Sequence, residues 1–299
     1  MPRVRDIGPV VRRVGILKFV TRVWREVGDD NLFPWAASLA YSWMFAIFPF
    51  LIVLLSLLPH LPEYMKEEAY ADVDGVIDQI MPSNAGGILK QQVHLVLNQP
   101  HTGGLLSISL LVAIWAASGG MAMTMSALDK AYDVEHPRKF YKHRLIAILL
   151  TIIVAALIVA VMILLPVGTA VIHWFQILGP LKWALNAVRY GIALLFMLTV
   201  LALIYYFGPS HRRRFVFLTP GSLFCVTVWV LLGLTFRLYV NRYAAVSYNK
   251  TYGAVAGVAI LLLFFYIDAL VLLAGAEINA EVEAELRKEP RPSPVTAPP

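Results

Sequence analysis

Asp268 is the residue whose position in this sequence most strongly indicates chemistry. It lies inside a long apolar stretch, with aromatic side chains before it and alanine, leucine and valine after it. Ionisable side chains are costly inside a hydrocarbon layer and usually serve a ligand, an ion or a partner charge. Asp268 is therefore our first candidate for a binding residue. The alternative is that its carboxylate only satisfies a nearby helix end or a basic residue such as Lys130, Arg144 or Arg214.

Other polar residues fall at the same predicted depth as Asp268. Helical spacing places Ser118 and Asp129 on one helix face, and Asp268 and Asn279 on another. We predict a polar vestibule that opens to the cytoplasm and is lined by Asp268, Asp129, Lys130, Arg144, Ser118, Glu277 and Asn279. Basic residues at the same end are predicted to contact lipid headgroups of the inner leaflet: Arg138, Lys139, Lys142, Arg212, Arg213 and Arg214. Membrane topology alone would also produce this basic ring.

The sequence contains no motif typical of catalysis, of a metal site or of a cofactor site. Its 7 histidines show no HExxH spacing, and neither a P-loop nor a dinucleotide-binding glycine pattern occurs. No nucleophile elbow is present. Cys225 is the only cysteine, which excludes an intramolecular disulfide and a thiolate metal cluster. We therefore predict no catalytic residue, no bound metal and no cofactor.

Six apolar stretches must position the candidate residues. They cover residues 34–59, 105–126, 145–172, 187–207, 218–240 and 253–275, each near or above the ~20 residues with which a helix crosses a membrane. The 299-residue chain is 59% hydrophobic, with a mean hydropathy of +0.69. This predicts an all-α membrane protein with a six-transmembrane helix bundle at residues 34–280. Pro49 is expected to kink the first span, and Gly253 and Gly257 to pack helices closely.

The lysines and arginines predict how the chain is oriented. Most of the 25 lie in the N-terminal segment, in the second and fourth gaps between spans and in the tail. Positive residues are retained on the cytoplasmic side of a membrane, so both termini are expected in the cytoplasm. Topology thus accounts for the net charge of +6, and we predict no nucleic-acid partner. The oligomeric state is left open.

Three segments flank or interrupt the spans. Residues 1–33 contain an amphipathic helix, predicted to lie on the inner leaflet or to pack on the cytoplasmic ends of the spans. Residues 60–104 show helical periodicity with an acidic first half, which predicts an external helical hairpin and a possible docking site for a periplasmic protein. Residues 281–299 form a Pro-rich cytoplasmic tail that we expect to be disordered.

Several separated motifs carry a family resemblance. They are Ala36 to Tyr41 followed by Phe48-Pro49, Leu128 to Tyr132 followed by Arg138 to Arg144, Pro220-Gly221, Tyr248 to Gly253, and Gly275 to Glu281. With these motifs in this order, the chain resembles the YihY/BrkB family of bacterial inner-membrane proteins over Trp24 to Glu281. The resemblance implies a six-helix membrane fold. Some family members carry the inherited label ribonuclease BN. At Gly119 the chain departs from the bulkier or basic residue that is usual there.

These observations leave three functional hypotheses. The first is a non-enzymatic membrane protein that binds or translocates a lipid or another anionic amphiphile through the vestibule. The second is a membrane scaffold that docks a periplasmic partner through the acidic hairpin. The third is a ribonuclease, which would need a metal site built from the nearby acids Asp129, Glu277, Glu281 and Glu283.

Overall fold

The computed structural model describes residues 1–57, 103–174, 180–211, 214–239 and 253–288. These residues form eight α-helices and no strand. In chain order the helices are α1 (Val4–Val14), α2 (Ile16–Asp29), α3 (Leu32–Leu57), α6 (Gly103–Ala131), α7 (Phe140–Trp174), α8 (Pro180–Phe207), α9 (Pro220–Tyr239) and α11 (Gly253–Arg287). The predicted all-helical class is confirmed for this part of the chain.

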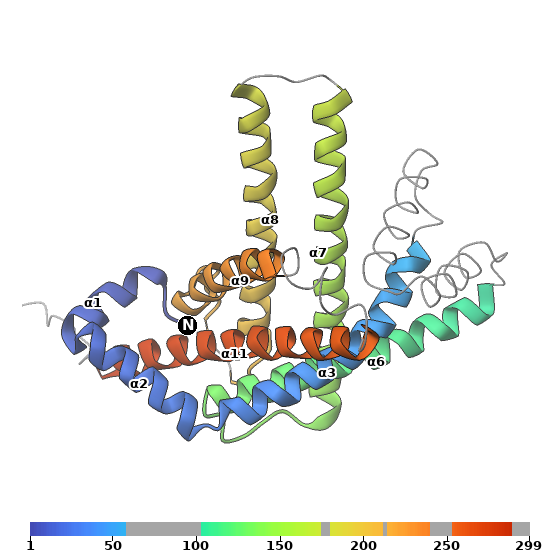
Figure 1. The fold of residues 1–299 in the computed structure, drawn as a ribbon. Helices are drawn as coiled ribbons and strands as arrows, with labels where there is room; N and C mark the ends of the chain where they lie inside the picture. The colour runs from blue at the N-terminus through green and yellow to red at the C-terminus, as the bar shows by residue number, and fades with distance from the viewer. Residues whose placement is uncertain (58–102, 175–179, 212–213, 240–252, 289–299) are drawn as a thin grey trace, which may run out of the picture.

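A layer of α3, α6 and α11 forms the centre of the molecule (Figure 1). α3 packs against both α6 and α11, and α9 packs against α11 and α8. The main apolar core lies where these helices meet, with fully buried residues such as Leu39, Leu128, Leu201, Tyr205 and Leu272. Burial of these large side chains stabilises the layer.

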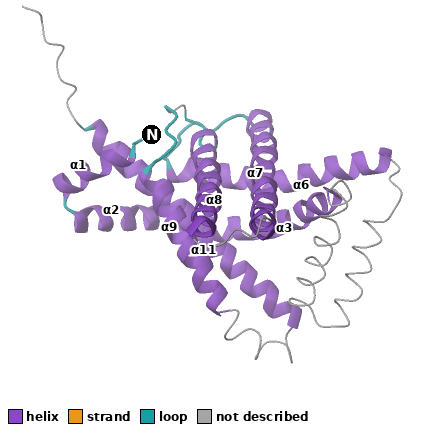
Figure 2. Cartoon of the chain, turned by 90° about the horizontal axis from the view of Figure 1, so that it is seen from above, coloured by secondary structure: helices purple, strands orange, loops and turns teal. Residues whose placement is uncertain are grey.

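α7 and α8 form a long antiparallel pair beside this layer. They contact one another, and α7 also contacts α6. Figure 1 shows the pair upright and α11 lying across it, and Figure 2, turned by 90°, shows the pair nearly end-on. The helices therefore do not all run along one direction. Apolar residues on the pair are exposed, including Leu149, Ile152 and Leu195, as expected of helices that face lipid.

Local signals set the helix ends. Gly15 separates α1 from α2 with φ of 88°, a conformation that suits glycine. Asn31 takes φ of 54° between α2 and α3. α9 starts with Pro220. Thr219, just before it, and Ser222, in its first turn, exchange hydrogen bonds: the backbone N–H of each donates to the side-chain oxygen of the other, at 3.0 and 3.1 Å.

Each of the six predicted spans falls on a helix, but the number of spans is not confirmed. Four helices are long and apolar enough to cross a membrane over their described residues: Leu111–Ala131, Phe140–Val161, Leu181–Phe207 and Val258–Arg287. The described apolar parts of α3 and α9, Leu32–Ile47 and Pro220–Thr235, are shorter. Several helices also exceed the predicted spans, since α7 starts at Phe140 and α11 continues to Arg287. Lys, Arg and Glu have high helix propensity, so a helix continues past the point where its apolar stretch ends.

Some predictions fall outside what the structure describes. The predicted hairpin lies almost wholly in residues 58–102, outside the described residues. Of the tail predicted to be disordered, residues 281–299, the first part is helical as the end of α11, up to Arg287, and residues 289–299 lie outside the described residues. α3 continues through Pro49, and α11 contains Gly253 and Gly257. The kink predicted at Pro49 and the close packing predicted at Gly253 and Gly257 fall on residues whose side chains are outside the described part of the structure.

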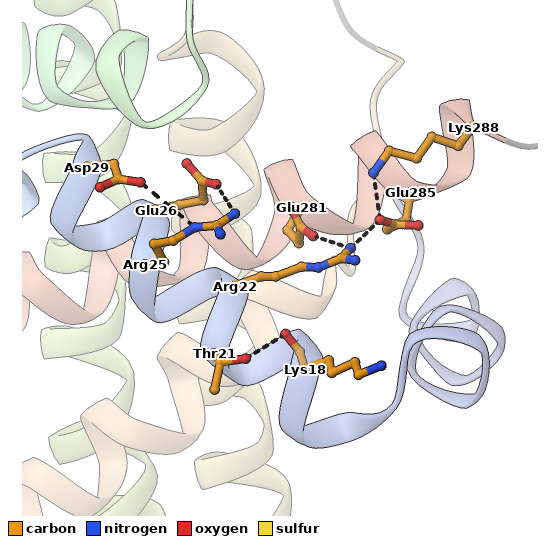
Figure 3. Close-up of polar contacts among 9 residues, drawn as sticks. All are labelled: Lys18, Thr21, Arg22, Arg25, Glu26, Asp29, Glu281, Glu285 and Lys288. Carbon is orange, nitrogen blue, oxygen red and sulfur yellow. Dashed lines mark hydrogen bonds and ion pairs between the residues drawn. The ribbon is translucent and has the colours of Figure 1, made fainter.

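The N-terminal helices α1 and α2 pack on the far end of α11. Arg22 of α2 donates to Glu285 at 2.6 Å and to Glu281 at 3.4 Å, and Lys288 also donates to Glu285, at 2.7 Å (Figure 3). The hydrogen bond with Glu285 is the main reason that the pKa of Arg22 is raised. Beside these ion pairs, Val10, Phe19 and Val282 form a small apolar cluster. This packing agrees with the alternative in which the N-terminal amphipathic helix packs on the ends of the spans.

The opposite face of α2 remains exposed. Leu17, Val20 and Trp24 are 79%, 57% and 67% exposed, and the Trp24 ring makes an edge contact with Phe33 at the start of α3. An apolar stripe next to the first apolar helix suits a position at the membrane surface. α2 therefore has one face for α11 and a second face that fits the interfacial alternative.

Candidate functional site

Asp129, at the end of α6, holds the segment that follows α8. Its carboxylate accepts hydrogen bonds from the backbone N–H of Ser210 at 2.5 Å and from the Ser210 hydroxyl at 2.6 Å. Asp129 is 7% exposed. Hydrogen bonds to a buried carboxylate are strong, so this side chain joins two distant segments.

Arg138 completes the same joint from the segment before α7. Its guanidinium donates to the carbonyl oxygens of Phe207 and Gly208, both at 2.8 Å, and of Pro209 at 2.5 Å. These carbonyls at the end of α8 lack partners within the helix, so Arg138 acts as a C-terminal cap. Burial lowers the pKa of Arg138, and the Asp129 carboxylate partly offsets this. Arginine remains charged all the same.

Lys130 and Glu277 meet at a third acidic residue, Asp30. The Lys130 ammonium group donates to Asp30 Oδ1 at 2.8 Å. The Glu277 carboxyl lies within hydrogen-bonding reach of the Asp30 carboxyl. These contacts join α6 and α11 to the turn between α2 and α3. The sequence indicated Lys130 and Glu277 as candidate site residues, but it did not indicate Asp30.

Asn279 caps the start of α9. Its Oδ1 accepts a hydrogen bond from the backbone N–H of Gly221 at 2.8 Å, and its amide nitrogen donates to the Tyr132 hydroxyl at 3.4 Å. The side chain is fully buried. An N-terminal backbone N–H of a helix has no partner within the helix, so Asn279 satisfies one of these groups.

Ser118 and Arg144 meet at the carbonyl oxygen of Trp115. Ser118 Oγ donates to this oxygen at 2.8 Å, and Arg144 Nη2 donates to it at 2.5 Å. The Arg144 guanidinium carbon also lies 4.2 Å from the centre of the Trp115 ring, a cation–π contact. Arg144 thus joins α7 to α6, whereas the Ser118 hydrogen bond lies within α6.

Asp268 is half-buried on α11. Its backbone carbonyl accepts a hydrogen bond from the Trp229 indole at 3.3 Å. Two of the basic residues expected near it contact other groups: Lys130 contacts Asp30, and Arg144 contacts Trp115. Arg214 is exposed. The described polar contacts therefore do not bring these groups together with Asp268 into one vestibule.

One cavity nevertheless opens among part of the predicted set. Its volume is about 800 Å³, and it lies between the end of α6, the following loop and the start of α7. It is lined by Ser126, Asp129, Lys130, Asp133, Val134, Glu135, Pro137, Arg138, Phe140 and His143. Three predicted site residues, Asp129, Lys130 and Arg138, thus share it. Asp268, Ser118, Arg144, Glu277 and Asn279 do not line it.

The remaining basic residues of the prediction are exposed or outside the described residues. Lys139 and Lys142 flank the cavity-lining Phe140 and are exposed, as is Arg214. Phe140 and Tyr141 are 69% and 85% exposed, and their rings make an edge contact. Arg212 and Arg213 fall outside the described residues.

The model of the family described as "Virulence factor BrkB" matches residues 23–298. The chain belongs to the BrkB family. It is 35% identical over 250 residues to the "Putative ribonuclease-like protein YfkH" of Bacillus subtilis (strain 168), covering 82% of this chain and 88% of that protein. The resemblance noted in the sequence is confirmed.

Proteins called UPF0761 membrane protein are further relatives of this BrkB-family chain. One from Chlorobium phaeobacteroides is 25% identical over 260 residues, covering 85% of this chain and 55% of that protein. One from Xanthomonas oryzae pv. oryzae (strain PXO99A) is 26% identical over 287 residues, covering 92% of this chain and 62% of that protein. The chain thus spans little more than half the length of these relatives. No solved structure matches the chain.

Three residues at these joints of the BrkB-family chain were not singled out from the sequence. Asp30 and Ser210 lie in turns, where polar residues are common and give no specific signal. Tyr205 is fully buried, and its hydroxyl donates to the Leu272 carbonyl at 2.8 Å and lies 3.0 Å from Cys225 Sγ. A tyrosine inside an apolar helix needs a partner for its hydroxyl, and this signal was available in the sequence.

The acids that a ribonuclease would need are engaged separately in this BrkB-family chain. Asp129 binds Ser210, Glu281 pairs with Arg22, and Glu283 pairs with Arg287 at 2.8 Å. In the part of the chain that the structure describes, no three His, Cys, Asp or Glu side chains gather as a possible metal site.

Proposed function

We propose that this membrane protein binds an anionic amphiphile, such as a lipid with a negatively charged headgroup, at the cavity between α6 and α7. The observation that carries the proposal is the cavity of about 800 Å³, which combines Lys130, Arg138 and His143 with the exposed ring of Phe140. A charged headgroup and an apolar chain need these two kinds of surface side by side.

The basic residues in the cavity retain donors for a ligand. Arg138 uses three N–H groups on the carbonyls at the end of α8, and a guanidinium has five. Lys130 makes one described hydrogen bond, to Asp30, and an ammonium group has three donors. Two of the acids lining the cavity, Asp133 and Glu135, are exposed and favour a headgroup that also carries donors.

The rim favours a position at the membrane surface. Exposed Phe140 and Tyr141 lie between exposed Lys139 and Lys142 at the start of α7. Aromatic and basic residues in this combination are typical of the boundary between lipid and water. We infer that the cavity faces the cytoplasmic leaflet of an inner membrane, with both chain termini on that side. We further propose that the protein moves the bound lipid between the two leaflets.

Matched variants at the two ends of the α7–α8 pair test this. Tyr141→Ala combined with Lys142→Gln removes an exposed aromatic and its lysine neighbour beside the cavity. Trp183→Ala combined with Lys182→Gln does the same at the opposite end, where both residues are also exposed. Because a basic residue near an anionic surface contributes ~1 kcal/mol, the first variant should bind several-fold less anionic lipid.

The readout is native mass spectrometry of purified protein with phosphatidylglycerol or phosphatidylcholine. Retention of phosphatidylglycerol should fall in the Tyr141/Lys142 variant and stay at the wild-type level in the Trp183/Lys182 variant. Equal retention in all three proteins would refute the site. A dye-labelled lipid in reconstituted vesicles then tests translocation, which is refuted if the lipid crosses no faster than in empty vesicles.

A ribonuclease activity has no support beyond the name of the Bacillus subtilis relative. The acidic residues that such an activity would need do not meet at one point among the described side chains. Cleavage of RNA by purified protein that vanishes in Asp129→Asn, while the folded state is retained, would favour it over the lipid proposal.

A further inference from the structure

Glu277 is buried in a way that an ionised carboxylate does not tolerate alone. The residue is 3% exposed, and its Oε1 atom is buried without a hydrogen-bond partner among the described residues. Leaving a buried charge unsatisfied is strongly unfavourable, and a group in that position usually neutralises. Glu277 lines neither of the two described cavities, so the lipid proposal does not account for it.

The neighbour of Glu277 is a second carboxyl group. Asp30, 7% exposed, reaches the Glu277 carboxyl from the turn between α2 and α3. Ionised carboxylates only accept hydrogen bonds, so a contact between two of them requires a proton on one. Lys130 donates to Asp30 at 2.8 Å and balances one negative charge. A second negative charge is left without a described cation.

We propose that Glu277 and Asp30 form a proton-binding site, in which one proton is shared between the two carboxyl groups and joins α11 to the α2–α3 turn. Two carboxyl groups that share a buried site do not both ionise near neutral pH, because each charge disfavours the other. The shared proton supplies the missing donor and leaves one net negative charge opposite Lys130. This inference does not depend on the proposed lipid function.

The other charged groups around the site strengthen this preference. Besides Asp30, the groups that act on Glu277 are Asp133, after α6, and Glu26, on α2, both acidic. Lys130, on α6, is the basic group at the site. Three acids facing one lysine disfavour a further negative charge on Glu277.

Loss of the proton is expected to affect the cavity between α6 and α7. Lys130 and Asp133 both line the cavity of about 800 Å³. When the proton leaves, two carboxylates compete for Lys130 and repel one another, so the joint between α11, α6 and the α2–α3 turn weakens. A proton bound in the folded protein and absent from the unfolded chain stabilises the fold at low pH, and this stability is lost as pH rises.

Infrared difference spectroscopy of the purified full-length protein tests the site directly. A protonated carboxyl group has a carbonyl band that a carboxylate lacks. In wild type we expect this band near neutral pH and its loss when the sample is titrated to alkaline pH. Glu277→Gln and Asp30→Asn should both lack it. Glu283→Gln, a control on the same helix whose partner is Arg287, should keep it.

Thermal unfolding across the same pH range gives an independent readout. The midpoint of wild type should fall as pH rises, whereas that of Glu277→Gln, whose amide donates to Asp30 without a proton, should fall less. A wild-type spectrum without the band at neutral pH would overturn the proposal, and so would a band that persists in Glu277→Gln. A midpoint raised by added sodium or magnesium, with no band, would also overturn it and indicate a cation instead. If Glu277→Gln does not fold, the proposal is tested by the carbonyl band alone, which should be present in wild type and absent in Asp30→Asn.

Discussion

Replacement of Gly221 by alanine should separate α9 from α11. A Cβ atom at this position would overlap the Gly275 carbonyl oxygen and lie 2.7 Å from both Asn279 Nδ2 and the Gly275 carbonyl carbon. Most of these atoms belong to backbone, which cannot rotate away. The helices must therefore move apart, and the hydrogen bond from Gly221 N–H to Asn279 at 2.8 Å is lost.

The size of the effect follows from three contributions. Overpacking costs about 1–3 kcal/mol, and loss of the buried hydrogen bond costs about 1–3 kcal/mol. The higher helix propensity of alanine returns at most about 1 kcal/mol. We expect a net loss of roughly 3 kcal/mol in the free energy of unfolding, and a midpoint of thermal unfolding lower by about 10 °C at ~2–4 °C per kcal/mol.

Gly233→Ala on the same helix is the matched control. No atom lies within 4 Å of a Cβ built at Gly233, so this variant should be neutral or more stable by up to about 1 kcal/mol. Both variants are compared by thermal and denaturant unfolding in one detergent. If Gly221→Ala unfolds at the same midpoint as Gly233→Ala, close contact between α9 and α11 is refuted.

Two further variants test the joints between distant segments. Arg22→Ala removes the ion pairs to Glu281 and Glu285 and should raise amide hydrogen exchange in α1 and α2 but not in α7. Arg25 pairs only within α2, so the control Arg25→Ala should leave exchange in α1 and α2 unchanged. Equal exchange in both variants would contradict the packing of α2 on α11. Asp129→Asn weakens the hydrogen bonds to Ser210 and should lower the free energy of unfolding, measured with denaturant, by about 2 kcal/mol. The control Asp133→Asn should leave it unchanged, because residue 133 is exposed and asparagine tolerates its φ of 49°. Similar losses of stability in the two variants would contradict the joint between Asp129 and Ser210.

The helices were largely predictable because hydrophobic runs report them directly. Each of the six apolar runs falls on a helix, and the N-terminal amphipathic pattern falls on α2. The helix ends were less predictable, since a membrane boundary is a change of polarity, not of backbone preference. Glu281 and Glu285 continue α11 and pair with Arg22. The direction of α7 and α8 across α11 depends on packing between distant segments, which no local pattern encodes (Figure 2).

The candidate site was predictable as a list of polar residues but not as an arrangement. Helical spacing places residues on faces, but it does not give the rotation of one helix against another. Asp129, near the end of α6, and Asn279, within α11, are both buried; Asn279 caps the start of α9 and Asp129 holds Ser210. Their partners lie in turns or in the first turn of a helix, where backbone groups lack partners and recruit polar side chains.

This distribution separates the polar residues into two kinds with different expected effects. Asn279, Arg138 and Asp129 satisfy backbone groups at helix ends, so their loss should destabilise the protein whatever ligand is present. The exposed Lys139 and Lys142 make no such backbone contact in the described structure, so their loss should alter ligand binding at nearly constant stability. Glu277 differs from both because its buried oxygen lacks a donor. A variant that replaces the proton with an amide should therefore preserve the fold and reduce the fall of its stability with rising pH, which neither of the other kinds would do.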